Sequence, residues 1–359
     1  MRIPVRAVPY VRLTKRLLLG PGSLEDASFQ KDILCPDQKT TIPPPVFLPG
    51  QLDKVIKQKY DIRGWGRKTR EDAIAEVTST AVTYAPTIAY HIKNAVLFDG
   101  CVYIGRFKQP IAHNSLFISG ASEPRHIRTC ALASSFLGTK FFGHWLTDDC
   151  TRYVLAEKLD TPLCVRMPAY PHRQKYQTYF NQSWDPTDRA FIDHLIVFQD
   201  FSQNSFKQER YRHLRNRIKV HFTANVGSDY VYLRRGRTGA LRIIQNEQEI
   251  LDALIKRGFV VVDVGSDELA HIIGTLLNAK LVVSLEGSHV THCTYTIPES
   301  SGLLILQPSN EFSAVHRDWA GSLGIKFGFV VGSVVDHGYH FSVLEILRTV
   351  DLMLKPSAT

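Results

Sequence analysis

Residues 259–285 read FVVVDVGSDELAHIIGTLLNAKLVVSL, and this stretch decides the fold class. It opens with the apolar run FVVVDV at 259–264 and closes with a second run, KLVVSL, at 280–285. Runs that are apolar at nearly every position are typical of strands covered on both faces, and the helical pattern between them predicts a parallel β-α-β unit. We expect Ser266 to cap this helix, and its predicted buried stripe consists of Leu269, Ile272, Ile273, Leu276 and Leu277.

The same alternation of strands and helices continues on both sides of that unit. The strand DYVYLRR at 229–235 precedes a helix that begins near Asn246, the candidate N-cap. Beyond the unit, the apolar runs GLLILQ at 302–307 and FGFVV at 327–331 flank a helix near 313–323. The C-terminal half is therefore predicted to be an α/β domain with a mainly parallel sheet.

The N-terminal half has weaker patterns. The dipeptide Asp99-Gly100 between AVLF and CVYI predicts a β-hairpin, because both residue types tolerate the left-handed backbone of a two-residue turn. The other expected elements are a helix over 141–158, strands over 162–166 and 194–198, and a linking segment over 199–219.

The length of 359 residues favours two domains of ordinary size. We predict an N-terminal extension and connector over 1–60, a first domain over 61–222, a second domain over 223–340 and a closing helical segment over 341–359. The pattern leaves open whether that last helix packs back against the first domain.

The formal net charge of +9 favours an anionic partner. Basic residues concentrate at 207–219 and at 234–242. Charge alone leaves nucleic acid, phosphorylated ligands and an anionic membrane surface open. For 207–219, we favour a solvated helix face or a linker over a specific site.

The opening segment, 1–20, lacks the unbroken apolar stretch of a signal peptide, and no later segment is long and apolar enough to span a bilayer. The six cysteines form no C-x-x-C pair, which is typical of reduced thiols in a cytosolic protein. We therefore expect a cytoplasmic protein without a disulfide or metal scaffold.

Arginines gather where the first strand of the C-terminal sheet ends. Arg234 and Arg235 close that strand, and Arg237 and Arg242 follow in its loop. Ligands of open α/β sheets sit at the carboxyl ends of the strands, and the arginine fork matches phosphate oxygens. We favour a diphosphate site there over a loop that only solubilises the sheet edge.

A second strand ends in the turn Glu286-Gly287-Ser288-His289. Gly287 lets backbone approach a ligand, Ser288 is a donor for phosphate, and Glu286 is an acceptor for ribose or sugar hydroxyls. His289 and His292 are three residues apart, but two histidines without a third ligand favour a structural role over a metal site.

A titratable cluster occurs in the N-terminal half, where His144 stands beside aromatic residues and precedes Asp148 and Asp149. An imidazole has the pKa range of a general base, and a carboxylate one helical turn away can orient it. The chain contains no D-x-D triad, so the carboxylates that commonly hold a metal-bound diphosphate are missing. It also has no G-x-G-x-x-G after a strand, which argues against a dinucleotide oxidoreductase.

Three segments in order resemble glycosyltransferase family 61, which includes bacterial capsular-polysaccharide proteins and plant xylan-modifying transferases. KFFGHWLTDDCTRYVL looks like the N-F-G-H-W-L-x-D segment of that family, and YVYLRRGRTGALRIIQNEQEILDALIKRGFVVV is similar to its Y-x-S-R-R, R-x-x-x-N-E and G-F motifs. LVVSLEGSHVTHCTYTIPESSGLLILQP takes the place of its Gly-x-His-Gly-Ala-x-Leu-x-Asn segment, with Glu286, Ser288 and His292 replacing histidine, alanine and asparagine. The resemblance covers 140–308.

The resemblance implies a GT-B fold of two facing Rossmann-like domains with mainly parallel sheets, an inverting mechanism and no catalytic metal or other cofactor. The expected donor is a nucleoside-diphosphate sugar on the C-terminal domain. The expected acceptor is a saccharide or lipid-linked acceptor on the N-terminal domain. The closest-looking relatives suggest a cytoplasmic role in capsule or other surface polysaccharide biosynthesis. Peripheral contact with an anionic membrane stays open, and no nucleic acid is expected.

Residue pattern and resemblance together assign the roles. His144 is the leading base, with Asp148 as its orienting partner or as the base itself. Arg234, Arg235 and Arg242 form the diphosphate clamp, and Asn246 and Glu247 are structural residues near the site. The expected lining of the nucleotide or sugar pocket is Glu286, Gly287, Ser288 and His289.

Two alternatives keep the fold but deny catalysis. The basic face would then bind nucleic acid or another anionic polymer, or the departures at Glu286 and His292 would mark an inactive relative that serves as a partner subunit. A polymer-binding module predicts steeply salt-dependent affinity, whereas an inactive relative predicts donor binding without turnover.

Overall fold

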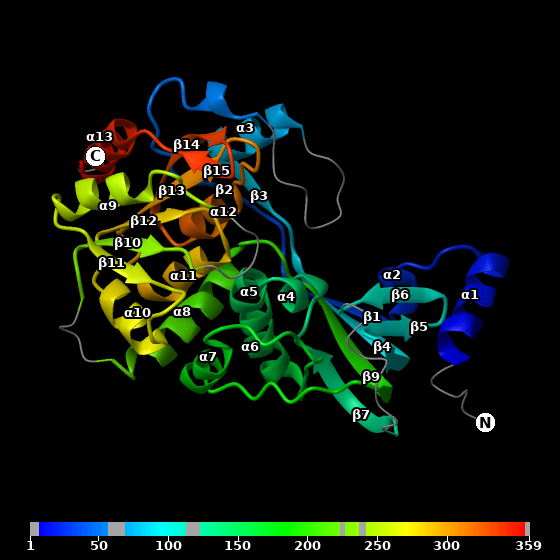
Figure 1. The fold of residues 1–359 in the computed structure, drawn as a ribbon. Helices are drawn as coiled ribbons and strands as arrows, with labels where there is room; N and C mark the ends of the chain where they lie inside the picture. The colour runs from blue at the N-terminus through cyan, green and yellow to red at the C-terminus, as the bar shows by residue number, and fades with distance from the viewer. Residues whose placement is uncertain (1–6, 57–68, 113–122, 223–226, 237–241, 356–359) are drawn as a thin grey trace. The chain divides into compact units, whose positions relative to one another are not determined.

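The computed structural model describes residues 7–56, 69–112, 123–222, 227–236 and 242–355 (Figure 1). Contacts divide the chain into two compact units, each made of two segments. The first unit combines Met1–Gln38 with Tyr84–Leu214, and the second combines Lys39–Thr83 with Arg215–Thr359. The boundaries predicted at 60, 222 and 340 stay a prediction.

A six-stranded sheet forms the centre of the second unit. Its order is β11-β10-β12-β13-β14-β15. Its strands are β10 (Tyr230–Arg234), β11 (Val260–Asp263), β12 (Leu281–Leu285), β13 (Gly302–Pro308), β14 (Lys326–Val335) and β15 (Gly338–His340). The first five are parallel, and only β15 runs antiparallel to its neighbour. The mainly parallel sheet expected for the C-terminal half is confirmed.

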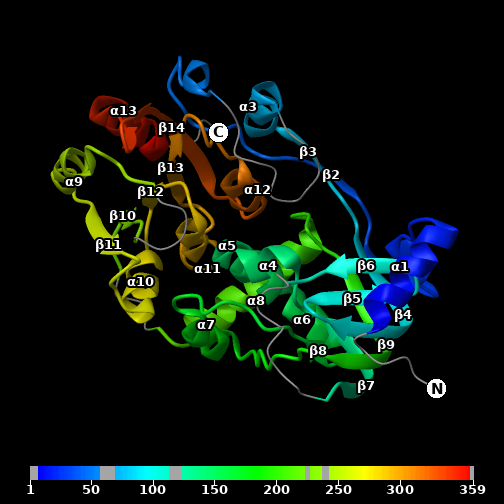
Figure 2. The same ribbon diagram turned by 45° about the vertical axis from the view of Figure 1, so that its right-hand side comes forward.

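Helices cover both faces of this sheet. Figure 2 shows α9 and α13 on one face, and α10, α11 and α12 on the other. The helices of the unit are α3 (Arg70–Thr78), α9 (Glu247–Ile255), α10 (Leu269–Leu276), α11 (His292–Thr296), α12 (Val315–Ser322) and α13 (Val343–Leu354), with short 3-10 turns at Leu52–Lys54 and Ser288–Thr291. The closing helix α13 packs against β13, β14 and α9 within this same unit.

The buried stripe predicted for α10 is confirmed at four positions. The predicted N-cap of this helix is wrong. Leu269, Ile272, Ile273 and Leu276 are buried, whereas Leu277 is half-buried at the helix end. The N-cap is Glu268, not Ser266. Residues 263–267 form their own turn, in which the Asp267 carboxylate accepts from the Asp263 amide, so the helix begins later than its spacing suggested.

The first unit is built on a seven-stranded mixed sheet of order β6-β5-β4-β9-β7-β8, with β1 also paired to β4. Its strands are β1 (Gln30–Cys35), β4 (Thr87–Phe98), β5 (Cys101–Ile104), β6 (Phe107–Pro110), β7 (Arg125–Leu132), β8 (Pro162–Leu163) and β9 (Ala190–Gln199). A two-stranded ribbon, β2 (Gln38–Thr41) and β3 (Ala81–Tyr84), lies where the chain passes between the units.

The expectation of a mainly parallel sheet is wrong for the first unit. Only β7 runs parallel to its neighbours β8 and β9, and the remaining pairs are antiparallel. The predicted hairpin explains part of this result. Asp99 and Gly100 both have positive φ, 50° and 65°, and a two-residue turn can join only antiparallel strands.

The helices of the first unit are α1 (Val8–Leu19), α2 (Leu24–Ala27), α4 (Phe136–Lys140), α5 (Phe142–His144), α6 (Cys150–Leu159), α7 (Arg173–Phe180) and α8 (Ser205–Lys219), the last continuing past Leu214. A turn of π-helix, Trp145–Asp149, joins α5 to α6. The helix expected over 141–158 is therefore one nearly continuous helical segment with a widened turn in its middle. Within the described part of the chain, no helix combines the length and apolarity needed to cross a membrane.

Candidate active site

The order of the parallel strands creates a switch point in the second unit. After β10, the chain adds β11 on one side and then β12 on the other. Ligands of such sheets bind outside the carboxyl ends of the strands at the point where the order reverses. Here that point carries the residues that follow β10 and β12, which include Arg235 and Glu286.

Two guanidinium groups converge at this point. Arg235 and Arg242 each donate from Nη1 to the main-chain oxygen of Glu286, at 2.9 and 2.8 Å. Burial, and next the charge of Arg242, lower the pKa of Arg235 to about 10, so the guanidinium of Arg235 is still cationic at neutral pH. A carbonyl is a neutral acceptor, so this contact does not cancel either positive charge.

Part of the charge is balanced by a carboxylate. Arg242 donates from Nε and Nη2 to Oε2 of Glu311, at 2.8 and 2.7 Å, and only 1% of its side chain is exposed. Glu311 lies just beyond β13, at the same edge of the sheet. Arg242 is thereby fixed in position, as a charged group held by two acceptors.

The three arginines expected to form the diphosphate clamp do not all share the same partners. Arg234 donates from Nε and Nη2 to Glu247 at 3.0 and 2.8 Å, and its Nη1 lies 3.7 Å from a carboxylate oxygen of Asp263. Successive side chains at a strand end point to opposite sides, so Arg234 and Arg235 are directed to different partners. Arg237, also predicted in this loop, lies outside the described residues.

The two residues expected to be structural do hold the loop and the helix start. Glu247 accepts from Arg234 and, at 3.1 Å, from the hydroxyl of Tyr232. Asn246 precedes α9 without capping it through its side chain. Its amide instead exchanges two hydrogen bonds with the backbone of Phe341, at 2.8 and 3.2 Å, which joins the start of α9 to the segment before α13.

Gly287 makes room for an arginine. A Cβ on this residue would lie 2.3 Å from Nη1 of Arg235 and 3.0 Å from Nδ1 of His289. Its absence allows the guanidinium to reach the Glu286 carbonyl. Ser288 is half-buried, and its main-chain oxygen accepts from the Thr291 hydroxyl at 2.6 Å.

The side chains of Glu286 and His289 lie below the surface. Glu286 is 2% exposed, and its Oε2 lies 3.0 Å from Nε2 of His316. His289 contacts the Ser284 hydroxyl through Nε2 at 2.8 Å. Burial, and next the charge of Arg235, hold the pKa of His289 well below its usual range, so the ring is neutral.

The described residues contain no group of three or more His, Cys, Asp or Glu side chains arranged to hold a metal ion. His292, the histidine near His289, is fully buried in α11. Independence from a metal cofactor stays a prediction.

A second titratable cluster lies in the first unit, at the widened helical turn. Nδ1 of His144 lies 2.7 Å from Oδ2 of Asp148, one turn further along. The His144 side chain is 13% exposed, so part of the ring reaches the surface, whereas Asp148 is buried. Single π-helical turns occur often at functional sites, where they redirect side chains. The two residues meet as the sequence predicted.

Lys207, on α8, holds the other oxygen of Asp148. Its ammonium contacts Oδ1, and its side chain is completely buried. Burial raises the pKa of Asp148, but the charge of Lys207 and the hydrogen bond from His144 outweigh it and hold that pKa well below the usual range. Asp148 is therefore an ionised carboxylate with both oxygens engaged, which suits an orienting partner better than a proton acceptor.

The adjacent carboxylate has a different surrounding. Asp149 accepts from the amide and hydroxyl of Ser135, at 3.0 and 2.6 Å, and from Arg152 at 3.0 Å. Burial raises its pKa to about 7. Its carboxylate oxygens occupy the space that a Cβ on Gly138 would need, so Asp149 packs α4 closely against the π-helical turn. This residue is a packing element and does not contact His144 through any described hydrogen bond.

Residues 142–303 match the family model described as Glycosyltransferase 61. Over this segment, the chain is similar to glycosyltransferase family 61. The matched segment begins two residues before His144 and continues past His289, so it includes every site residue that the sequence predicted. A search of the curated proteins found no match.

The sequence patterns did not point to three residues of the two clusters. Lys207 was assigned to a solvated face, and Glu311 and His316 lie beyond the matched segment. The sequence did contain an indication that Lys207 is buried. It stands four, seven and eleven residues before the side chains of a single buried stripe, which consists of Tyr211, Leu214 and Ile218. Arg210 and Arg215 of the same helix are also buried, so a solvated face is wrong for these residues.

Proposed function

We propose that this protein is a member of glycosyltransferase family 61, and that it is an inverting, metal-independent enzyme that uses a nucleoside-diphosphate sugar. Its acceptor is a saccharide or a lipid-linked acceptor in surface polysaccharide biosynthesis. The two units correspond in this proposal to the two domains of a GT-B enzyme, with the donor on the second unit and the acceptor on the first. A cytoplasmic setting with peripheral contact to an anionic membrane belongs to the same proposal.

The convergence of Arg235 and Arg242 is the observation that carries the proposal. Two cationic groups meet at the carboxyl ends of β10 and β12, where open α/β sheets bind their ligands. A departing nucleoside diphosphate develops negative charge on its terminal oxygens as the glycosidic bond breaks. Preorganised guanidinium groups stabilise such charge without rearranging at the moment of reaction.

His144 is the proposed base. Its Nε2 takes the proton of the acceptor hydroxyl, while the acceptor oxygen attacks the anomeric carbon and the bond from that carbon to the diphosphate oxygen breaks. The imidazolium that forms is stabilised by Asp148, which stays ionised because Lys207 compensates its charge. This arrangement resembles the orienting carboxylate of other histidine bases.

Nucleotide binding tests the donor half of the proposal. Thermal unfolding would be followed with uridine, cytidine and guanosine diphosphates in the presence of a chelator, since a ligand that binds the folded state raises the unfolding temperature. We expect one base to stabilise the wild type and to have a much weaker effect on Arg235→Met. Arg257→Met is the matched control, because Arg257 is exposed and pairs with Asp351 on the surface. Equal stabilisation of all three proteins would refute the diphosphate site.

Transfer from the matching nucleotide sugar tests the base. A general base contributes about 10²–10⁴-fold, so His144→Ala should lose that much turnover while still binding the diphosphate. His126→Ala is the control, because His126 also pairs with a carboxylate but is half-exposed on the sheet. The anomeric configuration of the product, followed by NMR, checks inversion. Donor binding by the wild type without turnover on any acceptor would favour the inactive partner subunit instead.

A further inference from the structure

Helix α1 carries an apolar stripe that is largely exposed. The exposed fractions of Tyr10, Leu13 and Leu17 are 74%, 49% and 78%. These residues are spaced at i, i+3 and i+7, which places them on one face of the helix. Leu18 is also exposed, at 77%.

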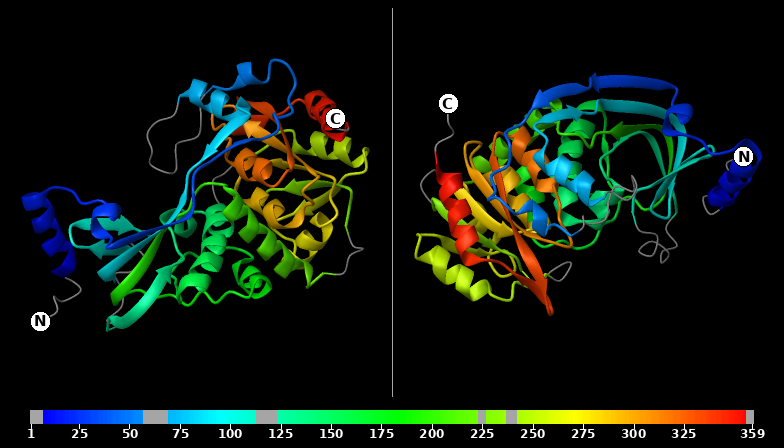
Figure 3. Two further views of the ribbon diagram at one scale, coloured as in Figure 1. Left: turned by 180° about the vertical axis from the view of Figure 1, so that it is seen from behind. Right: turned by 90° about the horizontal axis from the view of Figure 1, so that it is seen from above.

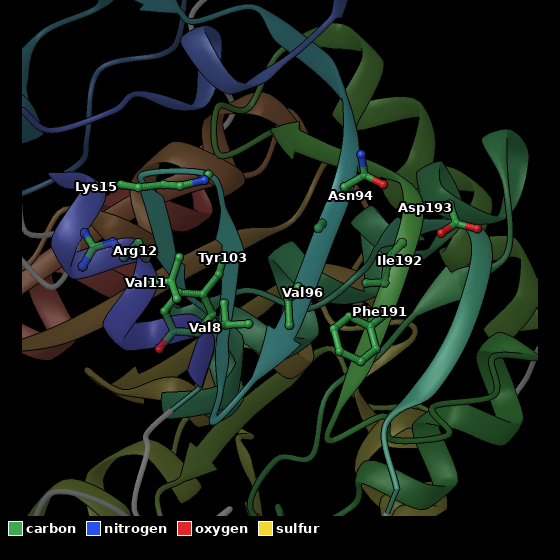
Figure 4. Close-up of a pocket in the computed structure, with 12 residues that line it drawn as sticks. Val8, Val11, Arg12, Lys15, Asn94, Val96, Tyr103, Phe191, Ile192 and Asp193 are labelled. Carbon is green, nitrogen blue, oxygen red and sulfur yellow. The ribbon is translucent and has the colours of Figure 1, made fainter. Parts of the chain in front are cut away.

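The opposite face of α1 is the one that meets the protein. Val8, Val11, Arg12 and Lys15, at i, i+3, i+4 and i+7, line a cavity of about 330 Å³ together with residues of β4, β5 and β9 (Figure 4). Arg12 donates from Nε to the main-chain oxygen of Arg106 at 3.2 Å. The helix is thereby held in one orientation, with its apolar stripe directed away from the sheet. Both views in Figure 3 place α1 at the periphery of the first unit.

Packing within the described part of the chain covers only one face of the helix, and incompletely. None of its residues is buried. A helix of twelve residues is marginal in water, and most helical stability in proteins comes from burying an apolar face. A second surface that covers Tyr10, Leu13 and Leu17 would supply that burial.

Charge identifies the kind of surface. The first 23 residues contain five basic side chains and no acidic one, and the basic residues are Arg2, Arg6, Arg12, Lys15 and Arg16. Arg12 and Lys15 lie on the face that meets the protein, whereas Arg16 adjoins the stripe, so a second copy of this helix would bring like charges together there. An anionic bilayer matches both features, because leucine and tyrosine side chains insert at the headgroup boundary while lysine and arginine remain among the phosphates.

We infer that α1 is an interfacial helix that binds the surface of an anionic phospholipid membrane through Tyr10, Leu13 and Leu17. The inference rests on the membrane contact in the proposed function and names the surface that makes it. Such a helix lies in the plane of the interface and does not span it. It would hold the chain where lipid-linked acceptors are available.

Flotation of the whole chain with vesicles tests this inference. Vesicles of phosphatidylcholine alone are compared with vesicles that contain roughly one quarter phosphatidylglycerol, at low and high salt. We expect binding to the anionic vesicles only, weakened by salt. The double variant Arg16→Gln with Leu17→Gln should lose about tenfold or more of this binding, because it removes one cation and one inserted leucine.

Ile255→Gln with Lys256→Gln is the matched control, an exposed apolar and basic pair on α9. The inference fails if the wild type does not float, or if both double variants float as it does. It also fails if light scattering shows a dimer that Leu17→Gln dissociates, since a second copy then covers the stripe. Diphosphate binding and transfer to a soluble acceptor should be unchanged in the α1 variant, so this test and that of the transferase fail independently.

Discussion

The two clusters use positive charge in opposite ways. In the first unit, Lys207 faces the buried carboxylate of Asp148, and Arg210 makes two 2.7 Å bonds to the buried Asp200. In the second unit, Arg235 and Arg242 share a neutral carbonyl, and Glu311 is the carboxylate that holds one of them. A cation matched by a built-in carboxylate has little attraction left for a ligand. The Glu286 carbonyl that brings Arg235 and Arg242 together carries no formal charge, so this contact, unlike the ion pair of Arg242 with Glu311, leaves positive charge that can attract an anion.

The largest expected effect is on folding in the first unit. Lys207→Met leaves Asp148 as a buried charge without its cation, which should lower the free energy of unfolding by about 3–5 kcal/mol. Lys219→Met is the control, because Lys219 is exposed at the end of the same helix. Chemical denaturation at neutral pH measures both. Similar stabilities for the two variants would mean that Lys207 does not compensate Asp148.

The pH dependence of this effect has a definite sign. In the wild type, the folded-state pKa of Asp148 is depressed, so its contribution is present above the unfolded pKa near 3.9 and is lost as pH falls through the folded value. In Lys207→Met, the cation that opposes the effect of burial is gone, so burial raises the pKa of Asp148. The variant should therefore recover part of the lost stability on acidification toward pH about 5, which Lys219→Met should not do.

The second-largest expected effect is on diphosphate binding, and it compares two neighbouring arginines. Arg235→Met should weaken nucleoside diphosphate binding by about 10- to 150-fold, because a hydrogen bond to a charged group contributes about 1.5–3 kcal/mol. Arg234→Met should change it much less, since Arg234 already pairs with Glu247. Calorimetric titration with the diphosphate found by thermal unfolding measures both. Equal losses would show that the ligand draws Arg234 away from Glu247, and the division of the clamp would be wrong.

The comparison also separates what the sequence could predict from what it could not. The strands of the second unit follow from their apolar runs, because a strand buried on both faces has few alternatives. The contact between His144 and Asp148 follows from helical spacing. Both patterns involve residues close together in the sequence, so they can be recognised without knowledge of the packing.

Long-range partners are not encoded in local spacing. Arg242 and Glu311 are 69 residues apart, and no pattern links them. Arg234 and Arg235 are adjacent and identical in type, so only the positions of Glu247 and Glu286 distinguish their roles. The antiparallel pairing of β4 with β1 and β9 likewise depends on segments far apart in the chain.

A third effect concerns how Arg235 is held. Gly287→Ala would place a Cβ 2.3 Å from Nη1 of Arg235, and the flexible end of that side chain can move aside. We expect diphosphate affinity to fall about fivefold, roughly 1 kcal/mol, with a smaller change in unfolding free energy. Gly274→Ala in α10 is the control, because its Cβ would meet only one atom, at 4.0 Å. If both variants bind the diphosphate like the wild type, the position of the guanidinium does not set affinity.

The smallest effect is a pH dependence in the second unit. Because the folded-state pKa of His289 is depressed by burial and by Arg235, the folded protein keeps this ring neutral while the unfolded chain takes up a proton near pH 6.5. The stability linked to His289 is therefore present above that pH and is lost as pH falls below it. Between about pH 7.5 and pH 6, the wild type should lose about 0.8 kcal/mol more than His289→Asn, measured by chemical denaturation. His126→Asn, at a half-exposed histidine, should follow the wild type. A His289→Asn variant that also follows the wild type would show that this ring takes up a proton in the folded protein, and a cationic His289 beside Arg235 would add a third positive charge to the diphosphate site.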